Sequence, residues 1–225
     1  MKPNIKIIEF TGLPGCGKTT LCNSIIESLS DYDFLLSSKF TASNKRKKSI
    51  FPPILDVSFR YLISLVYYLL ANKVSRKKGM FVYMLNLHAM YSKFMREHRG
   101  DSLILLVDQG FVQGLGSMAI GRSFINPHGL TSFLKHWKRF EKNMVLVDCL
   151  IPVEESAKRL IERNTLGGEF DKLRGEDLSK VMCSHVRLLH NLKQVLPDHG
   201  IHIKTIAIDM QNPIRSNLDI LFNNI

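Results

Sequence analysis

The stretch FTGLPGCGKTT, residues 10–20, decides the fold of this chain. It matches the pattern G-x-x-x-x-G-K-[ST], in which a loop between a strand and a helix cradles the phosphates of a nucleoside triphosphate. Glycines let the backbone curl so tightly that several N–H groups converge on one phosphate, and the following helix adds the positive end of its dipole. An apolar run at residues 5–10 and the spacing of Leu21, Ile25 and Leu29 predict that strand and that helix.

Each polar residue of the loop has an expected role. Lys18 is predicted to reach the β- and γ-phosphates and to act in catalysis, and the Thr19 hydroxyl to ligate Mg2+. Thr20 is expected on the α-phosphate side. The sequence therefore predicts ATP and Mg2+ as cofactors, bound by Gly12, Leu13, Pro14, Gly15, Cys16, Gly17, Lys18, Thr19 and Thr20.

Asp108 is the second candidate, because it follows an apolar strand predicted at residues 103–107. Carboxylates at the carboxyl ends of strands in open α/β sheets face the ligand crevice. We expect Asp108 to be a catalytic residue and a metal site, holding Mg2+ through water or accepting the proton of an attacking hydroxyl. The alternative is an aspartate that only caps a turn.

Arg159 and Arg163 form the third candidate. Their i, i+4 spacing places them on one face of a helix that Pro152 opens. A polar, glycine-bearing stretch at residues 164–177 follows, carrying Lys172 and Arg174. A basic helix end beside such a loop suits a closing lid, predicted at about residues 159–177, in which both arginines stabilise the transferring phosphoryl group. The alternative is a solvated basic face.

The remaining chain predicts one α/β domain over residues 1–225. Further strands are expected at residues 34–37, 144–149 and 203–208, with a helix at 130–142 and another at 176–195. Helices near 58–72 and 80–96 form a helical insertion at about residues 41–99. Apolar strands that alternate with helices indicate a parallel sheet covered on both faces, as in a three-layer fold.

The net charge favours anionic binding partners but does not identify one class of them. The formal charge of +11 favours phosphate esters, nucleic acid or an acidic membrane surface. Four cysteines without zinc spacing and an N-terminus without a secretion pattern predict a cytoplasmic protein. The most apolar run, residues 61–71, is too short to span a bilayer. We expect it to be a buried helix rather than a membrane-surface helix, because it is apolar on nearly every side.

The arrangement resembles the P-loop small-molecule kinases, nearest to thymidylate kinase and the deoxynucleoside kinases. Three stretches carry the resemblance: EFTGLPGCGKTTL, LILLVDQG and VLVDCLIPVEESAKRLIERN. The resemblance implies a five-stranded parallel sheet ordered 2-3-1-4-5 and phosphoryl transfer from ATP. It also implies that residues 209–213 lie near the adenine and that residues 41–99 lie where the phosphate acceptor binds.

Two departures concern the acceptor. Thymidylate kinase-like enzymes have arginine after the aspartate, where this chain has Gln109, and residues 37–40 lack the acidic residue of deoxynucleoside kinases. Gln109 and Gln113 either bind a neutral polar acceptor through their amides or are surface or capping residues. An anionic acceptor has Arg60, Arg96 and Arg122 as candidates.

The leading hypothesis is therefore an ATP-dependent kinase for a small acceptor, with a nucleoside or nucleotide among the options. The alternative is an NTPase with a regulatory role or an ATPase associated with nucleic acid or a membrane. No nucleic-acid-binding motif supports the last option, no transmembrane segment is expected, and a homodimer is left open.

Overall fold

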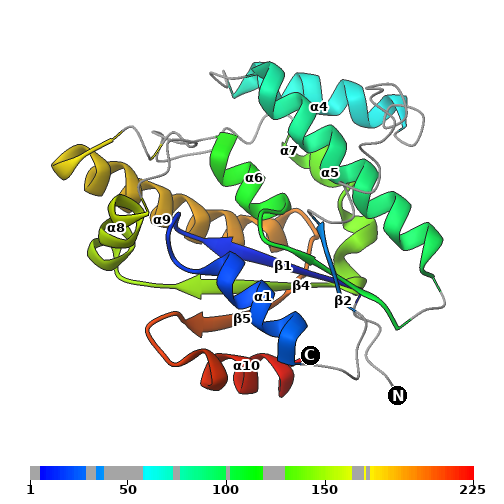
Figure 1. Ribbon diagram of the computed structural model, residues 1–225. Coiled ribbons are helices and arrows are strands. Elements are labelled where there is room, and N and C mark those ends of the chain that lie inside the picture. Colours follow the sequence, from blue (N-terminus) through cyan, green and yellow to red (C-terminus); the bar gives the residue numbers. More distant parts are fainter. Residues whose placement is uncertain are drawn as a thin grey trace.

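The computed structural model describes residues 6–28, 34–37, 58–72, 77–99, 102–118, 130–163, 170 and 173–225. Its centre is a sheet in which all paired strands are parallel, with the order β2-β3-β1-β4-β5 (Figure 1). The five-stranded sheet and its predicted order are thus confirmed. The strands are β1 (Ile7–Gly12), β2 (Phe34–Leu36), β3 (Ile104–Val107), β4 (Met144–Leu150) and β5 (Lys204–Asp209).

Burial along the strands follows their place in the sheet. Every residue of β1 and β3 is buried, because helices cover both faces at the centre. The edge strand β5 instead alternates, with Ile206 and Ile208 buried and their neighbours exposed. β1 pairs with β3 on one side and β4 on the other, so the loop that follows it lies in the middle of the carboxyl edge.

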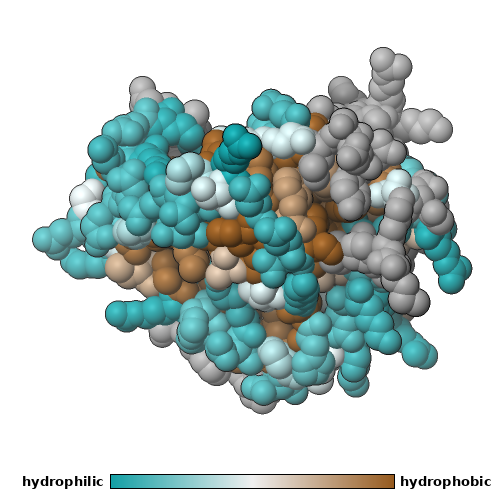
Figure 2. Space-filling view, turned by 90° about the horizontal axis from the view of Figure 1, so that it is seen from below, coloured by the Kyte–Doolittle hydropathy of each residue, from teal (hydrophilic) through white to brown (hydrophobic). Residues whose placement is uncertain are grey.

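Helices form a layer on each side of the sheet. One helical layer, which we call the lower layer, shares a core cluster with the side chains of Ile8, Phe10 and Val147. The upper layer, on the other face of the sheet, shares another cluster with Ile7, Val107 and Leu146. The lower layer contains α1 (Lys18–Ser28), α8 (Val153–Glu162) and α10 (Ile214–Phe222); the upper contains α4 (Phe59–Ala71), α5 (Lys77–Glu97), α6 (Phe111–Met118) and α7 (Leu130–Leu134). Seen from below, hydrophobic residues gather toward the centre of the face and hydrophilic residues surround them (Figure 2).

The longest helix, α9 (Gly175–Asp198), belongs to both layers. Its first half places Leu178 and Met182 in the lower core cluster. Its second half places Leu188 and Leu192 in the upper one. Helix α9 therefore contributes to the apolar cores on both sides of the sheet.

Two helices differ from the prediction. The helix expected at residues 130–142 ends at Leu134, and a turn leads into a 3-10 helix, η1 (Lys138–Asn143). Aromatic packing accounts for the break, since Trp137 stacks on Phe111 with ring centroids 4.1 Å apart. The expected inward residues, Phe133, Leu134, Trp137 and Phe140, are all buried. Helix α6 was not predicted, because its two glycines lower helix propensity; packing against α5 and α9 compensates.

The prediction of a buried helix at residues 61–71 is wrong for one face of α4. Tyr61, Leu65 and Tyr68 are buried, but the opposite face has apolar side chains that are 43–74% exposed. We call this face the α4 stripe: Phe59, Ile63, Val66, Tyr67 and Leu70. A helix that is apolar all round has no sequence signal that separates a core face from an uncovered one.

The predicted insertion and lid are described only in part. Helices α4 and α5 fall in the insertion, while residues 41–57 and 73–76 lie outside the described residues, as do Lys172 and Arg122. In the lid region, α8 ends at Glu162 and α9 begins at Gly175, and residues 164–169 lie outside the described part. Across the described parts of the chain, no helix combines the length and hydropathy that crossing a membrane needs.

The residues packed on the buried face of α4 and those on its exposed face should respond unequally to truncation. Phe133 is fully buried and stacks on Tyr68, so Phe133→Ala should lower the free energy of unfolding by about 3–5 kcal/mol. Ile63→Ala on the α4 stripe should change it by less than about 0.5 kcal/mol. Chemical denaturation at low protein concentration measures both, and equal effects would contradict the packing described here.

Candidate active site

The glycine loop has the tight backbone that the motif predicts. Gly12, Gly15 and Gly17 have φ of 145°, 81° and 101°, a region that other residues rarely adopt. At Gly12 a side chain is excluded by contact as well, because a Cβ there would lie 2.5 Å from the carbonyl oxygen of Cys149. Gly12 is the partner of Cys149 in the β1–β4 pairing, so the loop begins against the neighbouring strand.

Lys18 lies against the start of the loop. Its Nζ donates to the carbonyl oxygens of Gly12 at 3.0 Å and Leu13 at 2.7 Å, and lies 3.4 Å from Cys16 Sγ. A hydrogen bond from the Cys149 thiol and the charge of Lys18 outweigh burial and lower the pKa of Cys16 to about 6. The ammonium group is thus fixed at the head of α1 by backbone oxygens of the loop.

Asp108 lies beside the loop, as predicted. The Thr19 hydroxyl donates to Asp108 Oδ2 at 3.3 Å, across 89 positions of sequence. Asp108 directly follows β3, and Thr19 is exposed in the first turn of α1. Two oxygen ligands of the kind that Mg2+ prefers therefore stand next to each other.

Helix α8 contacts the loop from the other side. The Ser156 hydroxyl donates to the carbonyl oxygen of Pro14 at 2.6 Å. Arg159 lies one turn further along, but its Nε donates to Glu155 Oε1 at 2.9 Å. Arg163 is an exposed residue at the end of the helix. The structure brings α8 to the loop, while the catalytic roles of the two arginines stay predictions.

Glu9 is a buried acid that sequence inspection missed. The side chain has no exposure, and its carboxylate accepts from the Val112 N–H at 2.6 Å and the Tyr91 hydroxyl at 3.1 Å. Gly110 makes this approach possible, because a Cβ there would lie 2.1 Å from the Glu9 side chain. Burial raises the pKa of Glu9 to about 7, against the lowering effect of backbone N–H groups at the start of α6.

Gln109 and Gln113 lie in different environments. Gln109 is exposed, and its backbone carbonyl accepts from the Tyr83 hydroxyl at 2.9 Å. Gln113 is buried, and its Oε1 accepts from the Gly12 N–H at 3.1 Å and the Thr11 hydroxyl at 3.3 Å. Gln113 is therefore not a surface residue, and its side-chain oxygen is bonded to the start of the loop.

Other predicted residues lie in different parts of the surface. Arg60 and Arg96 are exposed on α4 and α5. Residues 209–213 begin with the last residue of β5, and Met210 lies beside the loop, since a Cβ at Gly17 would lie 3.1 Å from its side chain. Thr20 is exposed in the first turn of α1.

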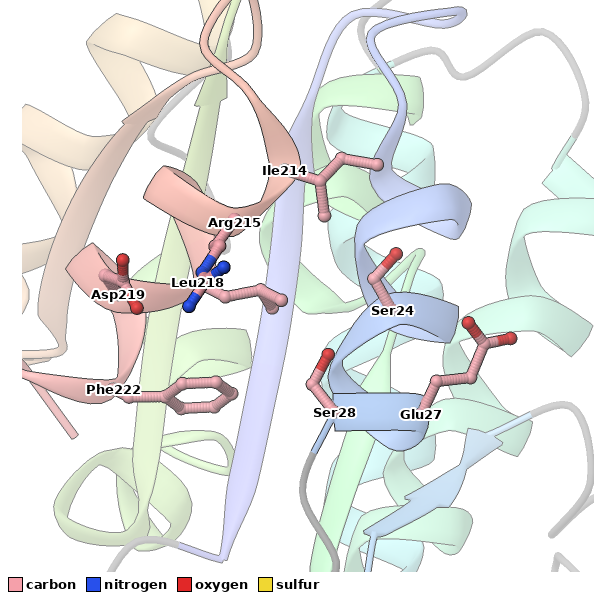
Figure 3. A pocket seen from close by; sticks show the side chains of 8 residues that line it. All are labelled: Ser24, Glu27, Ser28, Ile214, Arg215, Leu218, Asp219 and Phe222. Atoms are coloured by element: carbon pink, nitrogen blue, oxygen red, sulfur yellow. The ribbon is translucent and has the colours of Figure 1, made fainter.

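A groove of about 470 Å3 lies between α1 and α10, away from the loop (Figure 3). Leu218 and Phe222 extend from α10 toward α1, which contributes Ser24 and Ser28. The lining contains none of the predicted site residues.

No family model matches the chain, and no curated protein matches it by sequence. Among solved structures, deoxyadenosine kinase from M. mycoides with products dCMP and dCDP aligns at 14% identity and a TM-score of 0.47, covering 96% of this chain and 97% of that one. The same enzyme with bound dATP aligns at 12% identity and a TM-score of 0.48, and the alignment covers 97% of each chain. That enzyme is a deoxynucleoside kinase, one of the two groups that the sequence motifs resemble, but these values are too low to indicate what this chain binds or does.

The buried Glu9 predicts a pH dependence of stability. Its folded-state pKa of about 7 lies above the ordinary value of 4.5, so its stabilising contribution is complete below pH 4.5 and is lost as the pH rises through 7. At about 1.4 kcal/mol per pKa unit, the loss is about 3 kcal/mol. Glu9→Gln should abolish this part of the pH dependence in denaturation curves, whereas Glu27→Gln on the exposed face of α1 should retain it. Parallel curves for the wild type and Glu9→Gln would contradict the assignment.

Proposed function

We propose that the chain is an ATP-dependent kinase that transfers the γ-phosphoryl group to a small acceptor of the nucleoside or nucleotide class. The observation that carries the proposal is the 3.3 Å contact between Thr19 Oγ1 and Asp108 Oδ2 at the mouth of the glycine loop. A loop that only turned the chain would need neither a carboxylate at this position nor a lysine held at the head of the helix.

The residues suit a Mg2+–triphosphate complex. Backbone N–H groups of the loop and the N-terminus of α1 would receive the phosphates, and Lys18 would bind the β- and γ-phosphate oxygens. Thr19 and Asp108 would hold Mg2+, which neutralises charge on the phosphates. No group of three or more metal-binding side chains occurs among the described residues, and Mg2+ fits this, since it takes one or two carboxylates together with phosphate oxygens and water.

In the transfer step, Asp108 would accept the proton of an acceptor hydroxyl or hold the metal. Arg159 and Arg163 would stabilise charge on the phosphoryl group in transit. Arg159 must first leave Glu155, and both side chains of that pair are about one-third exposed. Such an ion pair is worth at most about 1 kcal/mol, so a triphosphate can compete for the guanidinium.

Phosphate transfer by the purified protein tests the proposal with a panel of nucleosides, nucleotides and sugars. Lys18→Ala and Asp108→Asn should each lower transfer by about two orders of magnitude, because charge stabilisation or proton acceptance is lost. Lys204→Ala, on the exposed side of the edge strand, should not change the rate. Steady ADP release that no acceptor stimulates would refute the kinase in favour of a regulatory NTPase or an ATPase associated with nucleic acid or a membrane.

We also propose that a second copy of this chain covers the α4 stripe. The five side chains recur at the spacing of a helix-packing seam, and Arg60 is the sole charged residue of α4, so the stripe is not interrupted by charge. A two-fold pairing would bury the same patch on both copies.

Light scattering after size exclusion tests this pairing. Wild type should elute as a dimer and Ile63→Lys with Leu70→Lys as a monomer, because two ammonium groups cannot be buried in an apolar seam. Val186→Lys, at an isolated exposed position of α9, is the control and should stay dimeric. A monomeric wild type that sediments with anionic vesicles through the stripe would refute the dimer and indicate membrane contact.

A further inference from the structure

Gln113, a residue of α6, connects the glycine loop to α9. Gln113 lies in the first turn of α6, and the Glu9 carboxylate fixes this turn by accepting the Val112 N–H at 2.6 Å. Its amide oxygen in turn accepts the N–H of Gly12 at 3.1 Å. One buried side chain thus transmits the position of α6 to the first residue of the loop.

Both polar backbone groups of Gly12 are occupied. Gln113 accepts its N–H, and Lys18 donates to its carbonyl oxygen at 3.0 Å. The N–H of Gly12 shares a rigid peptide plane with the Thr11 carbonyl, so anchoring this N–H fixes the plane from which the chain continues to the carbonyls of Gly12 and Leu13. The oxygens of those two carbonyls accept hydrogen bonds from Lys18 Nζ. The side-chain amide of Gln113 therefore influences where the ammonium group of Lys18 lies.

The other end of Gln113 faces α9. A backbone N–H is only a donor, so the Gln113 atom facing Gly12 is the oxygen, and Nε2 then donates to His185 Nε2 at 3.3 Å. His185 must present an unprotonated nitrogen there. Burial, followed by the charge of Lys18, lowers the pKa of His185 to about 4, so the ring is neutral at neutral pH.

We propose that Gln113, oriented by His185, is a positioning residue that places Lys18 for the γ-phosphate through Gly12. This rests on the proposed function only in that the loop must hold a nucleoside triphosphate. Gln113 touches no phosphate itself. Its effect is therefore expected on the part of binding that depends on Lys18 and the terminal phosphate, and much less on the part shared with a diphosphate.

Binding of a non-hydrolysable ATP analogue and of ADP, each with Mg2+, tests the proposal without requiring turnover. Gln113→Met has similar length but can neither accept from Gly12 nor donate to His185. It should weaken analogue binding by about tenfold and ADP binding by less than about threefold. A tenfold loss corresponds to the free energy of one hydrogen bond, here a bond in the series that positions the Lys18 ammonium group.

The matched control is Glu141→Met. Glu141 Oε2 accepts the His202 N–H at 3.1 Å, a side-chain bond to backbone of the same kind, but before β4 and β5 rather than at the loop. This variant should bind both nucleotides as the wild type does. Equal weakening of analogue and ADP, or the same loss in Glu141→Met, would reduce Gln113 to a structural role and overturn the proposal.

Hydrogen exchange of the free protein supplies a second measurement. The peptide containing Gly12 should exchange faster in Gln113→Met and in His185→Leu than in the wild type, and at the wild-type rate in Glu141→Met. Unchanged exchange in both variants overturns the proposal even if Gln113→Met folds too poorly for binding. A wild type that binds the analogue but phosphorylates no acceptor would refute the kinase alone, and the contrast between variants would still decide the role of Gln113.

Discussion

The hydrogen bonds between the Glu9 carboxylate and the first turn of α6 constrain most of the site. A carboxylate without solvent is tolerated only where protein donors replace water, and here the Val112 N–H and the Tyr91 hydroxyl do so. The contact needs Gly110 directly before the helix, because any side chain there would overlap Glu9. The place of α6 relative to the central strand, and with it that of Gln113, therefore depends on one acid in β1.

The loop is consequently held from several directions before any ligand binds. Gln113 holds its first residue from the upper layer, Ser156 holds Pro14 from α8, and the carbonyl of Cys149 excludes a side chain at Gly12. A binding loop that is already ordered loses less conformational freedom when the ligand arrives. Lys18 and Thr19 project from this fixed frame, next to Asp108.

Features with a local sequence signal could be predicted. The strands and the neighbouring positions of Thr19 and Asp108 follow from apolar runs, the glycine motif and the rule that parallel strands end at one edge. The order of the strands followed instead from the family resemblance. The roles of Gln113 and Glu9 could not be assigned from sequence, because their hydrogen-bond partners lie about a hundred positions away. Those partners also involve α6, a helix that was not predicted because of its glycines. Likewise the exposed face of α4 looks like its buried face in sequence, since both consist of large apolar residues. Arg159 shows a further limit: its spacing indicated a shared face with Arg163, but Glu155 on the preceding turn binds it.

Helix α9 contributes core residues on both sides of the sheet, with Leu178 and Met182 on one and Leu188 and Leu192 on the other. Detaching it would open both apolar clusters at once. Cooperative units in proteins are bounded by the contacts that must break together. The helical layers and the sheet should accordingly form one such unit, in which loosening of the layer around α6 is felt by the layer around α1.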